Sequence, residues 1–221
     1  MGLIPHVLHG WCLSPAEAQA LQRKLARQVR FEVPERMETV AGLDVSVRGK
    51  RGRAAVVVWE VATQQVLESL TVDGEVSFPY IPGLLSFREV PLLLRVLARL
   101  HTTPDVLMVD GQGVAHPRRC GLATHLGVLL DHPTVGVAKS RLVGHHAAPD
   151  LEKGSWVPLY DREEVIGAVV RTRTGVRPVY VSVGHRMTLE TAVALTLRCS
   201  TRYRLPEPTR LADQLSRQRA P

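Results

Sequence analysis

The order of the predicted elements indicates an α/β protein whose mixed central sheet is flanked by helices. Three extended segments separated only by short turns come first, at 40–47, 53–62 and 64–73. Two short apolar segments, at 105–110 and 133–139, then alternate with leucine-rich helical segments. Hairpins give antiparallel neighbours and helical crossovers give parallel ones, so the sheet is expected to contain both.

The length of 221 residues fits a single domain over 1–221, with a C-terminal arm at about 201–221. Hydrophobic residues make up 45% and charged residues 22%, the mixture of an ordinary globular protein. No apolar stretch reaches the roughly 20 residues that cross a bilayer, and no signal-peptide pattern is present. Three scattered cysteines favour neither a zinc site nor disulfides, which fits a protein of the reducing cytoplasm. We also expect a monomer without a membrane partner.

The first helix is expected at 13–29. Ser14 and Glu17 have the spacing of a capping box, Pro15 suits the first helical position, and leucines recur on one stripe. The glycine-rich sequence RGKRG between the first two strands fits a hairpin turn. The chain therefore begins with a helix that precedes a β-meander.

A second helix lies within 84–101, and its first residue is left open. Ser86 and Glu89 have the spacing of a capping box, which places the helix start near Ser86. Pro91 complicates that start, because a proline inside a helix removes a hydrogen bond, whereas a proline at its first position does not.

The second half of the chain predicts further helices and strands. A helix is expected at 119–131, and the segments 163–172 and 177–184 resemble a pair of antiparallel strands. A helix at 188–199 follows. The segment 201–221 holds three prolines and many charges, and we expect a surface arm with one short helical piece.

Three acidic residues are candidates for a metal site. With right-handed crossovers, the strand that carries Asp44 lies beside the strand that ends at Asp110. Glu89 belongs to the second helix. Each residue also has an ordinary interpretation, since Asp44 fits a strand edge, Asp110 an Asp-Gly turn, and Glu89 a helix cap. Taken together, three carboxylates at strand ends and a helix suit Mg²⁺ or Mn²⁺, which prefer oxygen ligands.

Positive charge points to a polyanionic partner. The net charge is +7 and the isoelectric point about 9.8, which favours association with phosphate backbones, although a basic protein without such a partner stays possible. The segments 47–53 and 116–119 concentrate the charge in loops. Lys139 follows an apolar strand and is a candidate for stabilising phosphoryl charge, while His116 and Arg118 are candidates for phosphate contacts.

Nucleotide-binding loops are not supported. GQGVAH has a histidine where the dinucleotide-binding pattern GxGxxG requires its third glycine, and no GxxxxGK[ST] sequence occurs. A nicotinamide or flavin enzyme is therefore not expected.

Six segments, in order, closely resemble the endonuclease V family of deoxyinosine 3′ endonucleases. They are AGLDVSV, PYIPGLLSFRE, VDGQGVAHPRRCGLATHLG, TVGVAKSRLVG, PVYVSVGHRMTLETAV and YRLPEPTRLAD. The resemblance covers 40–213, nearly the whole chain, and implies the ribonuclease-H-like fold of that family. It implies cleavage of the second phosphodiester bond 3′ to deoxyinosine in DNA, leaving a 3′-hydroxyl and a 5′-phosphate.

The resemblance also implies roles for individual residues. Asp44, Glu89 and Asp110 correspond to metal-site carboxylates that hold Mg²⁺, for which Mn²⁺ can substitute. Asp213 corresponds to a further acidic position near that site through a shorter match. Lys139 corresponds to the catalytic lysine.

The sequence PYIPG resembles the wedge that the family inserts into nucleic acid. Apolar wedges separate base steps, and extruding one nucleotide costs least where pairing is already weak, as it is for inosine. Without the resemblance, Tyr80 would fit a core tyrosine beneath a turn. Gly111 and Gly113 are expected to let the backbone approach the flipped base. The residues expected to contact the substrate are Tyr80, Ile81, Pro82, Gly83, Leu85, Gly111, His116 and Arg118.

Three alternatives remain open. The chain can be an endoribonuclease acting on inosine-containing RNA, or a nucleic-acid-binding module that kept the fold and lost the chemistry. The complete acidic set with Lys139 argues against the second. It can also be another ribonuclease-H-like enzyme, such as a junction resolvase or a transposase relative, against which the wedge argues.

Overall fold

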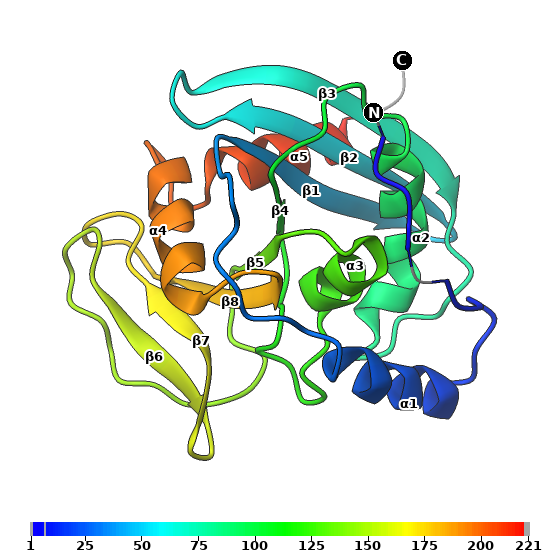
Figure 1. The fold of residues 1–221 in the computed structure, drawn as a ribbon, viewed down its shortest axis with the longest axis horizontal. Helices are drawn as coiled ribbons and strands as arrows, with labels where there is room; N and C mark the ends of the chain where they lie inside the picture. Colours follow the sequence, from blue (N-terminus) through cyan, green and yellow to red (C-terminus); the bar gives the residue numbers. More distant parts are fainter. Residues whose placement is uncertain (1, 7, 219–221) are drawn as a thin grey trace.

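The computed structural model describes residues 2–6 and 8–218 and contains one eight-stranded sheet. The sheet has the order β3-β2-β1-β4-β5-β8-β7-β6 (Figure 1). Its strands are β1 Thr39–Arg48, β2 Arg51–Glu60, β3 Gln65–Glu75, β4 Val106–Val109, β5 Thr134–Ala138, β6 Trp156–Asp161, β7 Glu164–Val170 and β8 Val179–His185. The helices are α1 Pro15–Ala26, α2 Leu85–Leu97, α3 Leu122–Leu130, α4 Leu189–Cys199 and α5 Glu207–Arg217.

The sheet is mixed, as the sequence predicts. The pairs β1–β4 and β4–β5 are parallel, and the other neighbouring strands are antiparallel. Leu43 of β1 lies opposite Val109 of β4, and the Asp110 N–H donates to the Leu43 carbonyl at 3.3 Å. Asp44, which lies within β1, and Asp110, which directly follows β4, are therefore side by side at the point where β4 ends.

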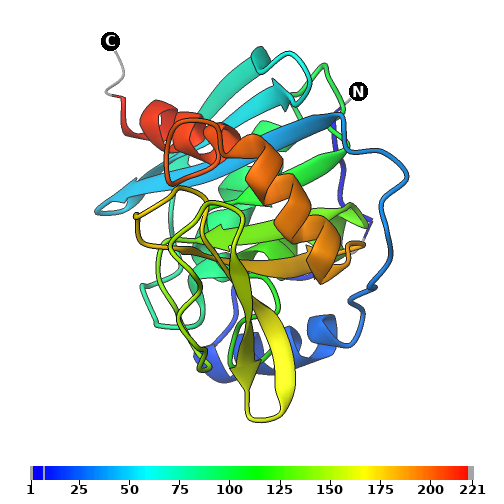
Figure 2. The ribbon, with the colours of Figure 1, turned by 90° about the vertical axis from the view of Figure 1, so that its left-hand side faces the viewer.

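Helices cover both faces of the sheet (Figures 1 and 2). Ala41 and Leu43 of β1 pack in one apolar cluster with α2 and α3, whereas Val40 packs in a second cluster that contains residues of α4. Because successive side chains of a strand point to opposite faces, β1 contributes to an apolar core on each face of the sheet. None of the helices in the described part of the chain combines the length and the apolar character needed to cross a bilayer.

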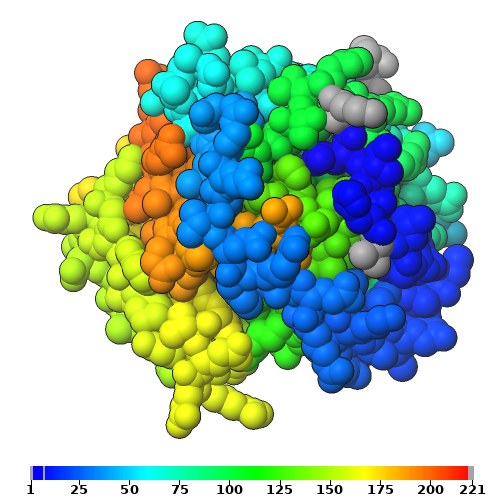
Figure 3. Space-filling view, viewed as in Figure 1, coloured from blue at the N-terminus to red at the C-terminus, as the bar shows by residue number. Residues whose placement is uncertain are grey.

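The segment between α1 and β1 crosses the molecule as a band of lighter blue (Figure 3). Its Arg30 carbonyl accepts the Arg186 N–H at 2.8 Å, and its Glu32 accepts the Arg186 guanidinium at 2.6 Å. Ser14 and Glu17 form the predicted capping box of α1, but the helix ends at Ala26 rather than at residue 29.

The helix start that the sequence leaves open lies at Leu85, and Ser86 and Glu89 do not form a capping box. Leu84 occupies the N-cap position of α2 without a side-chain hydrogen bond, and the Ser86 hydroxyl bonds instead to His125 Nδ1 at 2.8 Å. Pro91 lies inside the helix. Glu89 is therefore a residue of the helix interior and is not engaged in a cap.

The segment 201–221 contains the helical piece that the sequence predicts, but within the described residues, which end at 218, this helix is docked on the sheet and is not a free arm. The helix α5 packs on β1 and β2, with Pro208 and Ala212 buried. A Cβ placed on Gly42 of β1 would lie only 2.0 Å from the Pro208 carbonyl carbon, so the two backbones are in direct contact.

One strand was not predicted. β7 and β8 pair in antiparallel fashion, as expected, but a further strand, β6, pairs with the other side of β7. Pro158 lies within β6, which argues against a strand in sequence terms. Because β6 is at the edge of the sheet, that residue is tolerated.

Candidate active site

Three carboxylates from distant parts of the chain converge on the central strands of the sheet, at the point where β4 ends. β1 supplies Asp44, the end of β4 supplies Asp110, and α5 supplies Asp213. One oxygen of each lies within 4.8 Å of the others. We call these residues the acidic trio. Gly42, which admits the backbone of α5, is what brings Asp213 close to the two strand residues.

Two cations neutralise part of the acidic trio. Lys139 follows β5, and its Nζ lies 2.5 Å from Asp110 Oδ2 and 3.1 Å from Asp213 Oδ1. Arg217 donates to the same Asp213 oxygen at 2.7 Å. Burial alone would lower the pKa of Lys139, but the hydrogen bonds and charges of Asp110 and Asp213 outweigh it and raise that pKa. The ammonium therefore stays protonated beside the carboxylates.

Among the described residues, no cation forms an ion pair with Asp44. The Ser216 hydroxyl donates to Asp44 Oδ2 at 2.5 Å. Burial nevertheless raises the pKa of Asp44 above its usual value, and the negative charges of Asp110 and Asp213 add to the rise. A further positive charge at this position would be stabilising.

Glu89 lies outside the acidic trio but within its electrostatic reach. Burial, with smaller contributions from the negative charges of Asp44 and Asp110, raises the pKa of Glu89 to about 8. The set of donors therefore consists of carboxylate oxygens with an excess of negative charge. Such a set fits a hard divalent cation, which binds carboxylates and retains water ligands.

A pocket of about 390 Å³ opens beside the acidic trio, and Asp110 and Lys139 form part of its wall. This volume lies in the range of ligand-binding pockets. Seven of the eight residues expected to contact the substrate line it: Tyr80, Ile81, Pro82, Gly83, Leu85, Gly111 and His116. We call this cavity the base pocket.

The loop before α2 projects its tyrosine into solvent. The Tyr80 side chain is 71% exposed, so the alternative of a core tyrosine is wrong. Ile81 packs against the small apolar cluster that contains Phe87. Gly83 has φ +78°, which favours glycine, and this residue turns the chain into the helix. An exposed aromatic ring therefore stands on a fixed base at the rim of the base pocket.

His116 and Arg118 hold this loop in place through hydrogen bonds to its backbone, and their contact with phosphate stays a prediction. The His116 Nδ1 accepts the Arg118 N–H at 3.1 Å, so Nε2 carries the proton and donates to the Gly83 carbonyl at 3.0 Å. Burial, with a contribution from Arg118, lowers the pKa of His116 to about 4, which keeps the ring neutral. The Arg118 guanidinium donates to the Gly83 carbonyl at 2.7 Å and to Gln22 at 2.6 Å.

The geometry separates the two glycines that were expected to let the backbone approach a flipped base. A Cβ on Gly113 would lie 2.0 Å from the Val183 carbonyl oxygen, so this glycine serves packing against β8 rather than room for a base. A Cβ on Gly111 would make only ordinary contacts with Leu122 at 3.5 Å. His185 bonds to Asp131 at 3.0 Å and does not line the base pocket.

Three further residues contribute to the site although no sequence pattern predicts them. They are Ser216, Arg217 and Gln22. Ser216 and Arg217 follow Asp213 by three and four positions, so they lie on the same face once α5 is known to be a helix. Gln22 is buried in α1 and donates to the carbonyls of Gly83 and Cys120. Its role depends on tertiary packing alone.

Comparisons with known proteins agree with this geometry. The family model for endonuclease V matches residues 19–214. Endonuclease V from Roseiflexus sp. (strain RS-1) is 51% identical over 207 residues, which cover 93% of each chain. A solved structure of endonuclease V from Streptomyces avermitilis is 44% identical, with a TM-score of 0.90 over 96% of this chain and 95% of that one.

A more distant structure contains nucleic acid. Endonuclease V from Ciona intestinalis, in complex with a 24mer DNA containing an inosine followed by a ribo-adenosine, is 28% identical, with a TM-score of 0.79. The alignment covers 91% of this chain and 95% of that one. These likenesses confirm the predicted ribonuclease-H-like α/β fold. The chain belongs to the endonuclease V family of nucleases.

Proposed function

We propose that this protein is a Mg²⁺-dependent repair endonuclease that recognises deoxyinosine in DNA. It hydrolyses the second phosphodiester bond 3′ to the lesion and leaves a 3′-hydroxyl and a 5′-phosphate. The observation that carries this proposal is that the acidic trio adjoins the base pocket through Asp110, which together with Lys139 forms part of the pocket wall. A nucleotide held in that pocket leaves its 3′ phosphates beside the carboxylates. The complex of the Ciona intestinalis relative with inosine-containing DNA supports the choice of substrate.

The carboxylates and Lys139 have separate roles in the proposed reaction. Asp44, Asp110 and Asp213 would hold the cation, with Glu89 at its border. A bound Mg²⁺, or Mn²⁺ in its place, would offset charge on the phosphoryl group and lower the pKa of the attacking water. Lys139 stays charged and would donate a hydrogen bond to a phosphoryl oxygen as negative charge develops there.

Recognition rests on the loop from Tyr80 to Gly83 and on the pocket behind it. The exposed Tyr80 ring would replace the stacking lost when a base leaves the duplex. Inosine pairs weakly, so its extrusion costs less than that of a normal base. The Gly83 carbonyl is already held by His116 and Arg118, so the loop keeps its shape when the pocket fills.

The test uses duplex oligonucleotides that carry one inosine or one adenine at the same position. We expect nicking of the inosine strand only, at the second bond on the 3′ side, with Mg²⁺ and not with EDTA. Equal nicking of both duplexes, or nicking in EDTA, would contradict the proposal. A third substrate carries inosine in RNA, and its cleavage rate is compared with that of the DNA duplex. Faster cleavage of the RNA would favour the ribonuclease alternative.

A further inference from the structure

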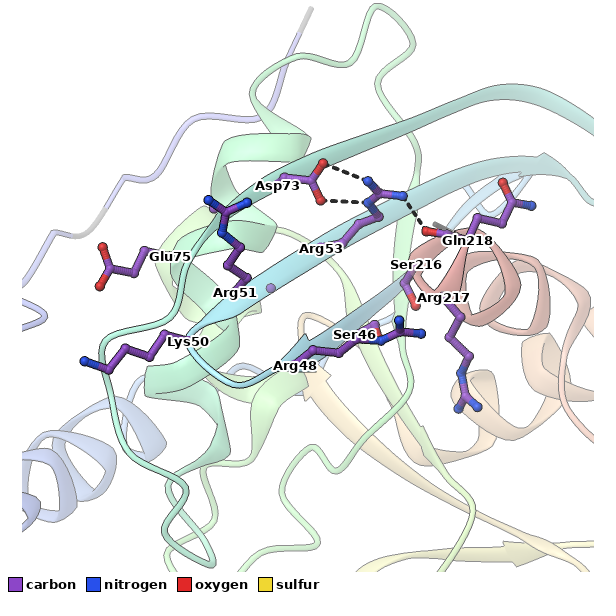
Figure 4. Close-up of a pocket in the computed structure, with 12 residues that line it drawn as sticks. Ser46, Arg48, Lys50, Arg51, Arg53, Asp73, Glu75, Ser216, Arg217 and Gln218 are labelled. Atoms are coloured by element: carbon purple, nitrogen blue, oxygen red, sulfur yellow. Dashed lines mark hydrogen bonds and ion pairs between the residues drawn. The ribbon is translucent and has the colours of Figure 1, made fainter. Parts of the chain in front are cut away.

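A second cavity, of about 850 Å³, lies on the outer half of the sheet next to the acidic trio (Figure 4). The end of the β1–β2 hairpin forms its floor, and the last residues of α5 form one wall. Three basic residues of this hairpin, Arg48, Lys50 and Arg51, are exposed. We call these three residues the hairpin platform.

Strand geometry puts the hairpin platform on the same face of the sheet as the acidic trio. Side chains two residues apart on a strand share a face, so Asp44, Ser46 and Arg48 of β1 point the same way. In the pairing with β2, Ser46 lies opposite Arg53, and Arg48 lies opposite Arg51. A row of basic residues therefore continues outward from Asp44 along the strand.

The helix α5 leaves this part of the sheet uncovered. The Ser216 hydroxyl bonds to Asp44, and the Gln218 carbonyl accepts from Arg53 at 2.5 Å. At that point the helix has ended, at Arg217. Among the described residues, the helix stops one row before the hairpin, and Arg48 and Arg51 line the cavity beyond its end (Figure 4).

The protein offsets the charge of the hairpin platform only in part: Glu75 lies opposite Arg51 on β3, and Asp73 is close enough for the Arg51 charge to help lower its pKa. Arg53, one row nearer the helix, makes a two-pronged bond to Asp73 at 2.7 Å and 2.9 Å. In the described part of the chain, no carboxylate forms an ion pair within 4.0 Å of Arg48, Lys50 or Arg51. Like charges directly opposite on neighbouring strands are destabilising, so the pair of Arg48 and Arg51 costs stability unless an anion binds there.

The three cavities follow one another in a fixed order. Asp110 and Lys139 line both the base pocket and a small cavity of about 270 Å³ at the acidic trio. Ser46, Arg48 and Arg217 line both that small cavity and the one over the hairpin platform. A strand that runs from the base pocket across the acidic trio therefore continues onto the hairpin platform.

We propose that the hairpin platform binds phosphates of the cleaved strand on the 3′ side of the cut. This inference rests on the proposed function for its direction: the lesion lies 5′ to the bond that is cut, so the strand beyond the acidic trio is the 3′ segment. Three exposed cations without an ion pair to any described residue, placed at the end of one hairpin, fit the repeated charges of a sugar–phosphate backbone and carry no base specificity.

The experiment compares two triple variants with the same change in net charge. R48Q/K50Q/R51Q removes the hairpin platform, and R99Q/R173Q/R198Q removes three exposed arginines that line none of the three cavities. Binding to inosine-containing single strands is measured by fluorescence anisotropy in EDTA. The strands carry a 3′ flank of about 3 or about 10 nucleotides, with the 5′ flank constant, and then the reverse.

We expect the wild type and the control variant to bind the long 3′ flank more tightly than the short one, and R48Q/K50Q/R51Q to bind both alike. Its plot of log affinity against log salt should be shallower by about 2, since about 0.7 counterion is released for each phosphate neutralised on a single strand. Shortening the 5′ flank should affect all three proteins equally.

The proposal is overturned if R48Q/K50Q/R51Q keeps the full dependence on the 3′ flank, or if the control variant loses it equally. It is also overturned if the dependence appears only in duplexes, which would assign the platform to the complementary strand. A failure of the proposed function looks different, because all three proteins would then bind and cut inosine and adenine strands alike.

Discussion

Asp110 connects the metal site and the base pocket in one side chain. It follows β4, accepts a hydrogen bond from Lys139 and lines the wall of the base pocket. We expect Asp110→Ala to lower cleavage of inosine-containing duplex by more than about 100-fold, because the charge that holds the cation is lost. Binding of the same duplex should stay measurable, since Tyr80 and the pocket loop are untouched. Single-turnover nicking and anisotropy give the two values.

The matched control for Asp110→Ala is Glu152→Ala, which removes an exposed carboxylate far from the acidic trio along the chain. Its cleavage rate should equal that of the wild type. Full activity of Asp110→Ala would remove this residue from the metal site and would leave Asp44 and Asp213 to be tested in its place.

Tyr80 offers a test of base extrusion because its ring is exposed. Tyr80→Ala should change the free energy of unfolding by no more than about 0.5 kcal/mol, as for other surface substitutions. It should weaken binding to inosine-containing duplex more than binding to undamaged duplex, because only the former needs the lost stacking replaced. Phe31→Ala, at a side chain that is 64% exposed and lines none of the three cavities, is the control. Equal losses on both duplexes would argue against a wedge.

The sequence predicts individual site residues unevenly, for physical reasons. Asp44, Asp110 and Lys139 could be located because they stand in or just after apolar strands, whose order in a sheet follows from connection rules. The phosphate contacts expected of His116 and Arg118 stay a prediction, and the sequence does not reveal the contact that these residues make within the protein. Their actual partner is a backbone carbonyl, that of Gly83, which lies 33 and 35 positions away and which no side-chain pattern reveals.

At the scale of elements, the contact between β1 and α5 decides whether the acidic trio forms. A Cβ on Gly42 would lie 2.0 Å from the Pro208 carbonyl carbon and 2.1 Å from its oxygen, so Gly42→Ala must displace the helix. We expect a loss of unfolding free energy of about 1–3 kcal/mol, as in other overpacked cores. Cleavage should fall as well, because Asp213 moves away from Asp44. Thermal unfolding and nicking assays measure the two effects.

Gly10→Ala is the control for that substitution, since a Cβ on Gly10 meets nothing within 4 Å. It should change neither stability nor cleavage. If Gly42→Ala unfolds at a lower temperature yet cuts at the normal rate, Asp213 is not needed in the acidic trio.

Several elements resisted prediction because tertiary contacts override local preference. The prolines at the start of α5 suggest an arm, yet Pro208 is at a position where a helix tolerates proline and its backbone packs on Gly42. Pro91 is retained inside α2 in spite of the lost hydrogen bond. The central strands were easier, because strands buried on both faces consist of continuous apolar runs.

At the scale of the whole molecule, buried histidines join the N-terminal segment to the helices beneath it. His125 of α3 is fully buried, with Nδ1 bonded to Ser86 of α2 and Nε2 bonded to His9 at 2.8 Å. The rings of Trp11 and Phe87 pack against it. Burial lowers the pKa of His125 to about 3, with a smaller contribution from His9.

This arrangement predicts that acid destabilises the protein well above the range in which carboxylates titrate. An unfolded histidine titrates near pH 6.5, so as the pH falls the unfolded chain binds a proton that the folded His125 refuses. The contribution of the neutral His125 to the free energy of unfolding is therefore complete above about pH 6.5. It is lost progressively toward pH 3, by about 1.4 kcal/mol per pH unit. His116, with its pKa lowered to about 4, acts in the same direction, whereas Glu89, with its pKa raised to about 8, acts in the opposite one, so the comparison of wild type with His125→Gln isolates the histidine. Urea unfolding of the wild type and of His125→Gln at pH 7.5, 6 and 5 measures the two slopes. The slope for His125→Gln should be shallower by about 1.4 kcal/mol per unit, and equal slopes would show that His125 is protonated in the folded protein.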